Sequence, residues 1–208
     1  MGKGNCMMGQ KLISILAVIL LFQGTLYSQN LDIDILRDIN LNRDRYLDNT
    51  FRGITNSADY VSFGVPVILL GTGLLIKNSI TTQNALFIGA SVLTAAAFST
   101  AIKYSVNRPR PFETYPDIQK CADGGSPSFP SGHTSDAFAL ATAASLAYPK
   151  WYLIAPAYIW AGAVGYSRMD LGVHYPSDVI FGAIVGAGSA YVCYVINQKL
   201  HRKLIKDK

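Results

Sequence analysis

Charged residues are scarce in this chain of 208 residues. They make up 15% of the sequence, whereas about a quarter is usual for soluble globular domains. Hydrophobic residues make up half of the chain, and they gather in runs separated by short polar turns. This balance indicates a membrane protein, and the length fits one domain.

The chain also lacks a cysteine pair and a basic stripe. Cys6, Cys121 and Cys193 are far apart in the sequence, so they indicate neither a zinc site nor a disulfide framework. The formal net charge is +5, but the basic residues are spread along the chain, and they cluster only in the motifs described below and in the C-terminal tail. Because no stripe remains for a nucleic acid duplex, no nucleic-acid partner is expected.

Residues 1–28 have the pattern of a secretory signal peptide. Lys3 and Lys11 precede an apolar run over residues 12–22, and small or polar residues follow. Cleavage after Ser28 fits this pattern, although Leu26 is poor for a small-residue site. An uncleaved signal anchor is the alternative.

Residues 29–60 are charged and amphipathic. Apolar residues such as Ile35, Leu36 and Ile39 recur among aspartates and arginines. Two interpretations stay open: a helix that lies in the membrane interface, or a solvated helix that packs its apolar stripe on the rest of the domain. Neither interpretation gives this segment a catalytic role.

Four apolar runs follow, at residues 61–76, 85–102, about 137–166, and 179–196. The third run is broken at residues 148–150, so five helices are expected. Some runs are shorter than the roughly 20 residues that a membrane span needs, and polar first turns supply the difference. We therefore predict a helical membrane domain over residues 61–198 and a basic tail over residues 199–208.

Three motifs border these runs. The first is Lys-Tyr-Ser-Val-Asn-Arg-Pro-Arg-Pro, from Lys103 to Pro111, and the second is Pro-Ser-Gly-His over residues 130–133. The third is Ser167-Arg168, followed after five residues by His174 and then by Asp178. Each motif opens or closes an apolar run, which is a more specific signal than any one motif alone.

These stretches resemble, in order and spacing, the signatures of the type 2 phosphatidic acid phosphatase (PAP2) superfamily: Lys-x6-Arg-Pro, Pro-Ser-Gly-His and Ser-Arg-x5-His-x3-Asp. Every signature position is present. The resemblance covers residues 103–178 and the flanking helices, and it leaves residues 1–60 unexplained. It implies an all-α fold, a membrane-embedded helical bundle of the PAP2/haloperoxidase type with about five transmembrane helices after the signal segment.

A phosphatase must surround the phosphate with cations, and the motifs contain them. Lys103, Arg110 and Arg168 are the expected phosphate ligands, since arginine binds two oxygens at once. Ser131 and Gly132 stand at a loop-to-helix junction, where free backbone N–H groups can bind a phosphoryl oxygen. The family register pairs Arg110 with Pro111, so Arg108 is interpreted as an anchor at the membrane interface.

His174 is the predicted nucleophile, four residues before Asp178 and just ahead of Pro176, which suits the first turn of the last helix. The resemblance implies that His174 forms a phosphohistidine and that Asp178 orients its ring. A carboxylate bonded to one ring nitrogen also makes the other nitrogen a stronger nucleophile. His133 is the predicted general acid. The remaining carboxylates are scattered, so neither a metal nor a cofactor is expected.

Charge and topology agree with an outward-facing site. If residue 60 lies outside the cytoplasm, the crossings place Lys77, Lys150 and the basic tail inside, as the positive-inside rule requires. The same count places all three motifs together at the periplasmic face of a bacterial inner membrane. Cations on that side are what an anion site requires.

The predicted substrate is a phosphorylated lipid, hydrolysed as a phosphomonoester. Lipid A is the first choice because the chain resembles short, signal-bearing periplasmic lipid A phosphatases. Undecaprenyl diphosphate is the second choice, and phosphatidic acid and phosphatidylglycerophosphate are further alternatives. The connection over residues 112–129 matches no signature and is expected to shape substrate access. The oligomeric state stays open.

Three other classes compete with this interpretation. Soluble class A acid phosphatases share the motifs, but the nearly uncharged helices and the basic tail disfavour them. Vanadium haloperoxidases share the anion pocket, but this chain is short for their additional helices. An inactive membrane lipid-binding scaffold is disfavoured because His133, His174 and Asp178 are all present.

Overall fold

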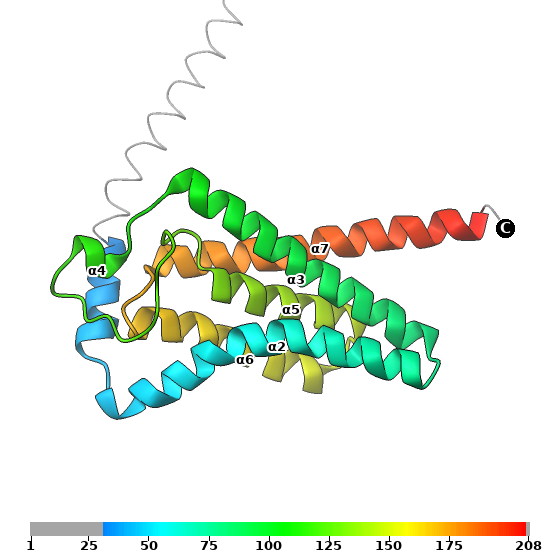
Figure 1. Cartoon of the computed structure of the whole chain (residues 1–208), viewed down its shortest axis with the longest axis horizontal. Helices are drawn as coiled ribbons and strands as arrows, with labels where there is room; N and C mark the ends of the chain where they lie inside the picture. The colour runs from blue at the N-terminus through cyan, green and yellow to red at the C-terminus, as the bar shows by residue number, and fades with distance from the viewer. Residues whose placement is uncertain (1–30, 207–208) are drawn as a thin grey trace, which may run out of the picture.

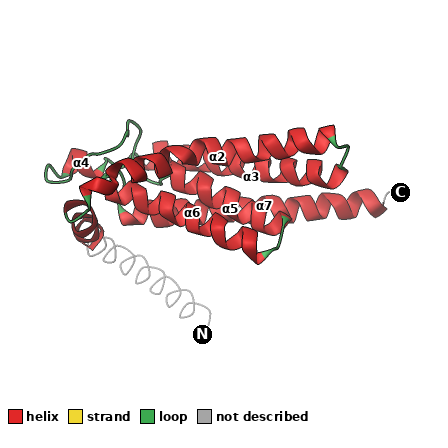
Figure 2. Ribbon diagram, turned by 90° about the horizontal axis from the view of Figure 1, so that it is seen from below, coloured by secondary structure: helices red, strands yellow, loops and turns green. Residues whose placement is uncertain are grey.

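The computed structural model describes residues 31–206, with side chains placed over residues 31–199. All regular elements in this part of the chain are helices (Figures 1 and 2). The predicted all-α class is therefore confirmed. The expected signal segment, residues 1–28, lies outside the described residues.

Five long helices form the body of the protein and lie alongside one another (Figure 1). They are α2 (Asp48–Leu75), α3 (Ser79–Val106), α5 (Gly132–Ala147), α6 (Trp151–Asp170) and α7 (Pro176–Lys206). Short turns join α2 to α3 and α5 to α6. The 3-10 helix η1 (Arg45–Leu47) precedes α2, and the one-turn helix α4 (Pro111–Thr114) lies in the long connection from α3 to α5.

The helical exterior is apolar enough for lipid. By length and composition, the segments Arg45–Leu75, Ser79–Thr114 and Pro176–Lys199 could each cross a membrane. Large hydrophobic side chains are exposed along the bundle, among them Val67, Leu93, Ile159 and Ile184. Exposed apolar surface of this extent is typical of a membrane-embedded protein.

The helices extend beyond the apolar runs that predicted them, because their end turns are polar. α2 begins at Asp48, well before residue 61, and runs without a break through the boundary expected near residue 60. α5 begins at Gly132 rather than near residue 137. α7 continues to Lys206, so basic residues expected in a separate tail extend the same helix.

α5 and α7 approach each other closely near the start of both helices. A side-chain carbon at Gly182 of α7 would lie 2.6 Å from the carbonyl oxygen of Ser131, the residue that precedes α5. Glycine is required at this contact because any Cβ would push the two backbones apart. The contact places the second motif directly against the helix that follows the third motif.

Residues 31–41 form a helix that packs across one end of the bundle, beside α4 (Figure 1). Ile33 and Leu36 of this helix are buried in one cluster with Ile118 and Tyr175. The segment therefore packs its apolar stripe on the domain, which is the second of the two interpretations. Tyr175 is next to His174 in sequence, so the helix lies close to a predicted site residue.

Candidate active site

The three sequence motifs meet at the end of the bundle from which α4 projects (Figure 1). α3 and α6 end there, and α5 and α7 begin there, because successive helices run in opposite directions. Backbone hydrogen bonds connect the motifs. The N–H of Ser131 donates to the carbonyl of Asp178 at 3.0 Å, and the N–H of His174 donates to the carbonyl of Arg168 at 3.2 Å.

Three cations lie buried in this cluster: Lys103, Arg110 and Arg168 are only 8%, 4% and 3% exposed. Lys103 Nζ donates to the carbonyls of Pro127 and Pro130, at 2.7 and 2.9 Å. Within residues 31–199, none of the three cations forms an ion pair with a carboxylate. Buried positive charge without a carboxylate partner is what an anion-binding site provides.

The two arginines are also held by neutral groups. Arg110 Nε donates to the carbonyl of Ser126 at 2.8 Å, and its Nη1 donates to that of Val173 at 2.9 Å. Arg168 Nη1 donates to Thr55 Oγ1 at 2.7 Å. The buried Nε of Arg168 has no hydrogen-bond partner among the described residues. A phosphoryl oxygen is a suitable acceptor for such a donor.

His174 faces a carboxylate on one side and a cation on the other. Its Nδ1 lies 3.4 Å from Asp178 Oδ2, and its Nε2 lies 3.5 Å from Arg110 Nη1. His174 belongs to the connection that ends at Tyr175, just ahead of the last helix. The helix starts only at Pro176, whose ring suits the first helical position.

Burial keeps the His174 ring neutral. It lowers the pKa of His174 to about 3, with the hydrogen bond to Asp178 opposing this change and the charge of Arg168 adding to it. The ring is therefore unprotonated near pH 7, so one nitrogen has a lone pair available. A neutral imidazole in this position can act as a nucleophile.

The second motif occupies the start of α5, as predicted, with Ser131 as the N-cap residue and Gly132 as the first helical residue. One expectation needs correction: the backbone N–H of Ser131 is occupied by Asp178, so only its hydroxyl remains as a donor. The N–H groups of Gly132 and His133 belong to the first turn and have no helical acceptor. They are available to an anion.

His133 lies at the edge of the cluster, with its side chain about one-third exposed, 32%. Its Nε2 is 3.8 Å from Asp59 Oδ2. His133 is therefore accessible to a group that enters from outside, whereas His174 is enclosed. No group of three or more histidine, cysteine, aspartate or glutamate side chains suited to a metal ion occurs among the described residues.

The model of the PAP2 superfamily matches residues 84–202, which is more than half of the chain. The chain belongs to the PAP2 superfamily. This match includes all three motifs and four of the five long helices. It excludes α2 and the helix over residues 31–41.

Curated relatives include a lipid A 4'-phosphatase of Bacteroides thetaiotaomicron, which is 37% identical over 40% of this chain and 37% of its own length. A decaprenylphosphoryl-5-phosphoribose phosphatase of Mycobacterium tuberculosis is 32% identical over 66% of this chain and 73% of its own length. A lipid A 1-phosphatase of Porphyromonas gingivalis is aligned over only 21% of its length. This chain thus spans well under half of the Bacteroides and Porphyromonas relatives.

Two solved structures share the fold. The crystal structure of Aquifex aeolicus LpxE has a TM-score of 0.68 and 27% identity, over 79% of this chain and 94% of that chain. A transmembrane PAP2-type phosphatidylglycerolphosphate phosphatase from Bacillus subtilis has a TM-score of 0.71 and 23% identity, over 90% and 96% of the two chains. These similarities confirm the PAP2 membrane fold predicted from the motifs.

Arg108 is not a PAP2 signature residue, and its interpretation as an interface anchor is wrong. Its guanidinium pairs with Asp178 at 2.8 Å and with Asp32 at 2.7 Å. α3 ends because Asn107 adopts the left-handed conformation, with φ of 50°, and this turns the chain toward the cluster. Arg108 therefore points into the site and not along the surface of a helix.

Ser128 is a second site residue that the PAP2 signatures do not include. Its hydroxyl donates to Asp178 Oδ2 and lies 3.4 Å from His174 Nδ1. The backbone N–H of Tyr175 also donates to Asp178 Oδ2, at 3.0 Å. Asp178 is thus held from several directions, which fixes the carboxylate that faces the histidine.

α2 contributes two further residues from outside the PAP2 match. Thr55 accepts the hydrogen bond from Arg168, and Asp59 lies beside His133. They are four positions apart on the same face of the helix. Two polar residues four positions apart, just before an apolar run, are the sequence signal that could have indicated these residues.

The connection between α4 and α5 covers the cations. Its backbone carbonyls at Asp123, Ser126 and Pro127 accept hydrogen bonds from Arg168, Arg110 and Lys103, respectively. Gly124 packs directly on Arg110, since a Cβ there would lie 2.6 Å from Nη1. These carbonyls accept from N–H groups that a substrate phosphate would also need. Some of these hydrogen bonds must therefore break when an anion binds.

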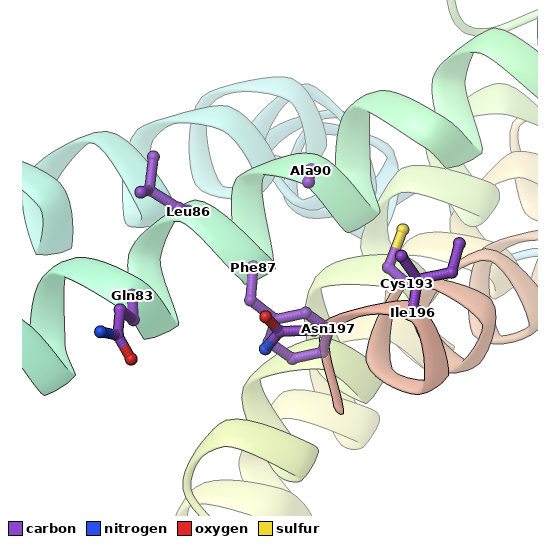
Figure 3. A pocket seen from close by; sticks show the side chains of 7 residues that line it. All are labelled: Gln83, Leu86, Phe87, Ala90, Cys193, Ile196 and Asn197. Atoms are coloured by element: carbon purple, nitrogen blue, oxygen red, sulfur yellow. The ribbon is translucent and has the colours of Figure 1, made fainter. Parts of the chain in front are cut away.

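Apolar hollows on the bundle lie away from this cluster. One, of about 290 Å³, lies between α3 and α7 near the opposite end of the bundle, with Leu86 and Phe87 on one side and Cys193 and Ile196 on the other (Figure 3). Another, of about 410 Å³, lies between α2 and α3. Neither hollow includes a motif residue, and both are lined mainly by side chains suited to lipid.

Replacing Gly124 by alanine is expected to lower kcat/KM by about tenfold, because a displaced phosphate ligand is costly to catalysis. The added methyl group would move either the connection or the Arg110 guanidinium. The measurement is phosphate release from p-nitrophenyl phosphate by purified protein in detergent. Gly125→Ala is the control: a Cβ there meets nothing within 4 Å, so its activity should stay within about twofold of wild type. Equal activities of the two variants would contradict a functional contact between the connection and Arg110.

Proposed function

We propose that this protein is a membrane lipid phosphatase that transfers the phosphoryl group of a lipid phosphomonoester to His174 and then to water. The observation that carries the proposal is the set of three buried cations without a carboxylate partner, next to the neutral His174 ring. A phosphate dianion would compensate this charge and lie within reach of Nε2.

In the first step, His174 Nε2 attacks phosphorus while the ester P–O bond breaks. Nδ1 keeps its proton and donates a hydrogen bond to Asp178, so the carboxylate stabilises the positive charge that develops on the ring. His133 gives its proton to the departing oxygen. Burial and the neighbouring cations lower the pKa of His133 to about 4, whereas Asp59 and the bound phosphate act in the opposite direction and favour the protonated ring before this transfer.

In the second step, water attacks the phosphohistidine. His133, now neutral, takes a proton from this water, the P–N bond breaks, and inorganic phosphate is released. Lys103, Arg110 and Arg168 stabilise the negative charge on the equatorial oxygens in both steps. The N–H groups at the start of α5 add to this stabilisation.

We propose lipid A as the substrate, with undecaprenyl diphosphate as the second candidate and glycerophospholipid phosphates as the third. Several curated relatives are lipid A phosphatases, and the similar structures include LpxE. The position of the site supports a lipid in general, because the cations lie at the end of helices whose outer surfaces are apolar. A lipid phosphate at the bilayer surface would reach that position with its chains still in the membrane.

We further propose that the site faces the periplasm in a bacterial inner membrane. Lys77 and Lys150 lie in the turns at the other end of the bundle from the motifs. The positive-inside rule places those turns in the cytoplasm.

Cysteine labelling tests this orientation in a variant whose three native cysteines are replaced by serine. K120C, in the connection over the site, is expected to react with a membrane-impermeant maleimide in cells whose outer membrane has been permeabilised. K150C is expected to react only after lysis. Labelling of both positions from the same side would contradict the helix count, and the reverse pattern would contradict the orientation.

Replacing His174 by alanine is expected to lower kcat by at least about three orders of magnitude, because the nucleophile is lost.

His133→Ala is expected to lower kcat less with p-nitrophenyl phosphate than with a lipid phosphate, since p-nitrophenolate leaves without a proton. Acid-labile phosphate trapped on the His133→Ala protein would support the covalent step. His201→Ala, which changes a histidine near the far end of α7, is the control. An active His174→Ala protein would disprove the mechanism.

A panel of substrates tests the lipid assignment. Phosphate release is measured in detergent from lipid A, undecaprenyl diphosphate, phosphatidic acid, phosphatidylglycerophosphate and a soluble monoester. We expect the highest kcat/KM for lipid A. If undecaprenyl diphosphate is preferred, the second candidate is correct. If the soluble ester is hydrolysed as well as any lipid, the membrane-substrate proposal is wrong.

A further inference from the structure

We propose that Asp32, which lies far outside the region matched by the PAP2 superfamily, is a positioning residue of this active site. It holds Arg108 against Asp178 and thereby keeps the Asp178 carboxylate in the orientation that His174 needs. The inference rests on the proposed phosphohistidine chemistry. It gives the helix over residues 31–41 a role in catalysis that the motifs do not indicate.

A continuous chain of short contacts connects Asp32 to Asp178. Asp32 Oδ2 lies 2.7 Å from Arg108 Nη2, and Arg108 Nη1 lies 2.8 Å from Asp178 Oδ1. Ser177 contacts both Asp32 and Arg108: its N–H donates to Asp32 Oδ1 at 2.8 Å, and its hydroxyl donates to Asp32 Oδ2 and accepts from Arg108 at 2.7 Å. Asp32 is 7% exposed, and Asp178 is fully buried.

Arg108 needs two carboxylates to be held in one orientation. It follows Asn107, the C-cap residue of α3, and lies outside any helix, so no helix restrains its backbone. Each Nη atom contacts a different carboxylate, and the guanidinium carbon lies 3.8 Å from the centre of the Tyr175 ring. A planar guanidinium keeps its orientation better when each of its two Nη atoms has a carboxylate partner than when only one of them has.

Arg108 in turn affects the orientation of the Asp178 carboxylate relative to the His174 ring. Asp178 uses Oδ1 for Arg108 and Oδ2 for the His174 ring, the Ser128 hydroxyl and the Tyr175 N–H. Ser128 and the Tyr175 N–H hold Oδ2, whereas Arg108 holds Oδ1. When the contact at Oδ1 loosens, the carboxylate plane can turn about Oδ2, and the lone pair that faces Nδ1 of the ring changes direction. Outer partners of this kind commonly change activity by 10- to 100-fold when they are removed, as metal-site histidines show.

The helix over residues 31–41 has other contacts that keep it docked without Asp32. Leu36 is fully buried. The Asn40 side chain accepts from the N–H of Gln119 at 2.8 Å and donates to its carbonyl at 3.1 Å and to that of Asp170 at 2.8 Å. A change at Asp32 should therefore alter the site while the segment stays folded.

The test compares Asp32→Asn with Asp34→Asn in the full chain, purified in detergent. Both changes remove one carboxylate from the same helix. The Asp34 side chain, however, is 68% exposed, and its ion pair with Arg37 is long, at 3.8 Å. We expect Asp32→Asn to lower kcat about tenfold and to slow formation of the phosphoenzyme, with KM and the melting temperature close to wild type. Asp34→Asn should stay within about twofold of wild type.

A double-mutant cycle identifies the route of the effect. Arg108→Lys retains the charge but can hold only one of the two carboxylates, so we expect a similar fall in kcat. Because both changes break the same chain of contacts, Asp32→Asn combined with Arg108→Lys should be no less active than Arg108→Lys alone. If Asp32→Asn does not accumulate as folded protein, Ser177→Ala replaces it, with a fall in kcat again expected.

Several results would overturn the inference. The first is equal activity of Asp32→Asn and Asp34→Asn. The second is a change in Asp32→Asn that affects only KM or only the melting temperature. The third is a double variant whose fall in kcat is the product of the two single falls. His174→Ala separates this inference from the proposed function. If that variant is inactive while Asp32→Asn is normal, only the role of Asp32 fails. If His174→Ala is active, the proposed mechanism fails.

Discussion

Positive charge buried at one end of an apolar bundle is the constraint on which the rest of the structure depends. Lys103 and Arg110 come from the first motif and Arg168 from the third, and burial of such charge costs several kcal/mol per ion unless other groups compensate it. In this structure, backbone carbonyls and Thr55 provide the compensation. Neutral acceptors compensate cations only partly, so an anion of high charge is the ligand that this end of the bundle favours.

Negative charge is kept separate from these cations. Asp178 and Asp32 both pair with Arg108, and not with the residues expected to bind phosphate. His174 lies between the two regions, with Asp178 on one side and Arg110 on the other. This separation allows a carboxylate to orient the histidine without occupying the anion site, and it explains why the chain uses one more arginine than the family signature contains.

Helix number, helix order and the common location of the motifs could be predicted, because a membrane requires long apolar runs and each run reverses the direction of the chain. The ends of helices could not be predicted as well. α2 starts at Asp48 because its first turns are polar and resemble a loop in composition. The start of α7 at Pro176 is an exception, because proline suits the first helical position and could be recognised from the sequence.

The sequence by itself determined the candidate site residues whose spacing follows local features: the cations at the end of α3, the Ser131-Gly132-His133 start of α5, and His174 with Asp178. Only the tertiary structure decided the roles of Arg108, Ser128 and Asp32. Asp32 and Ser177 are 145 positions apart and meet because the helix over residues 31–41 packs beside the start of α7. The physical reason is that a motif records local geometry along one stretch of chain, whereas these contacts depend on how separate helices pack and where each connection turns.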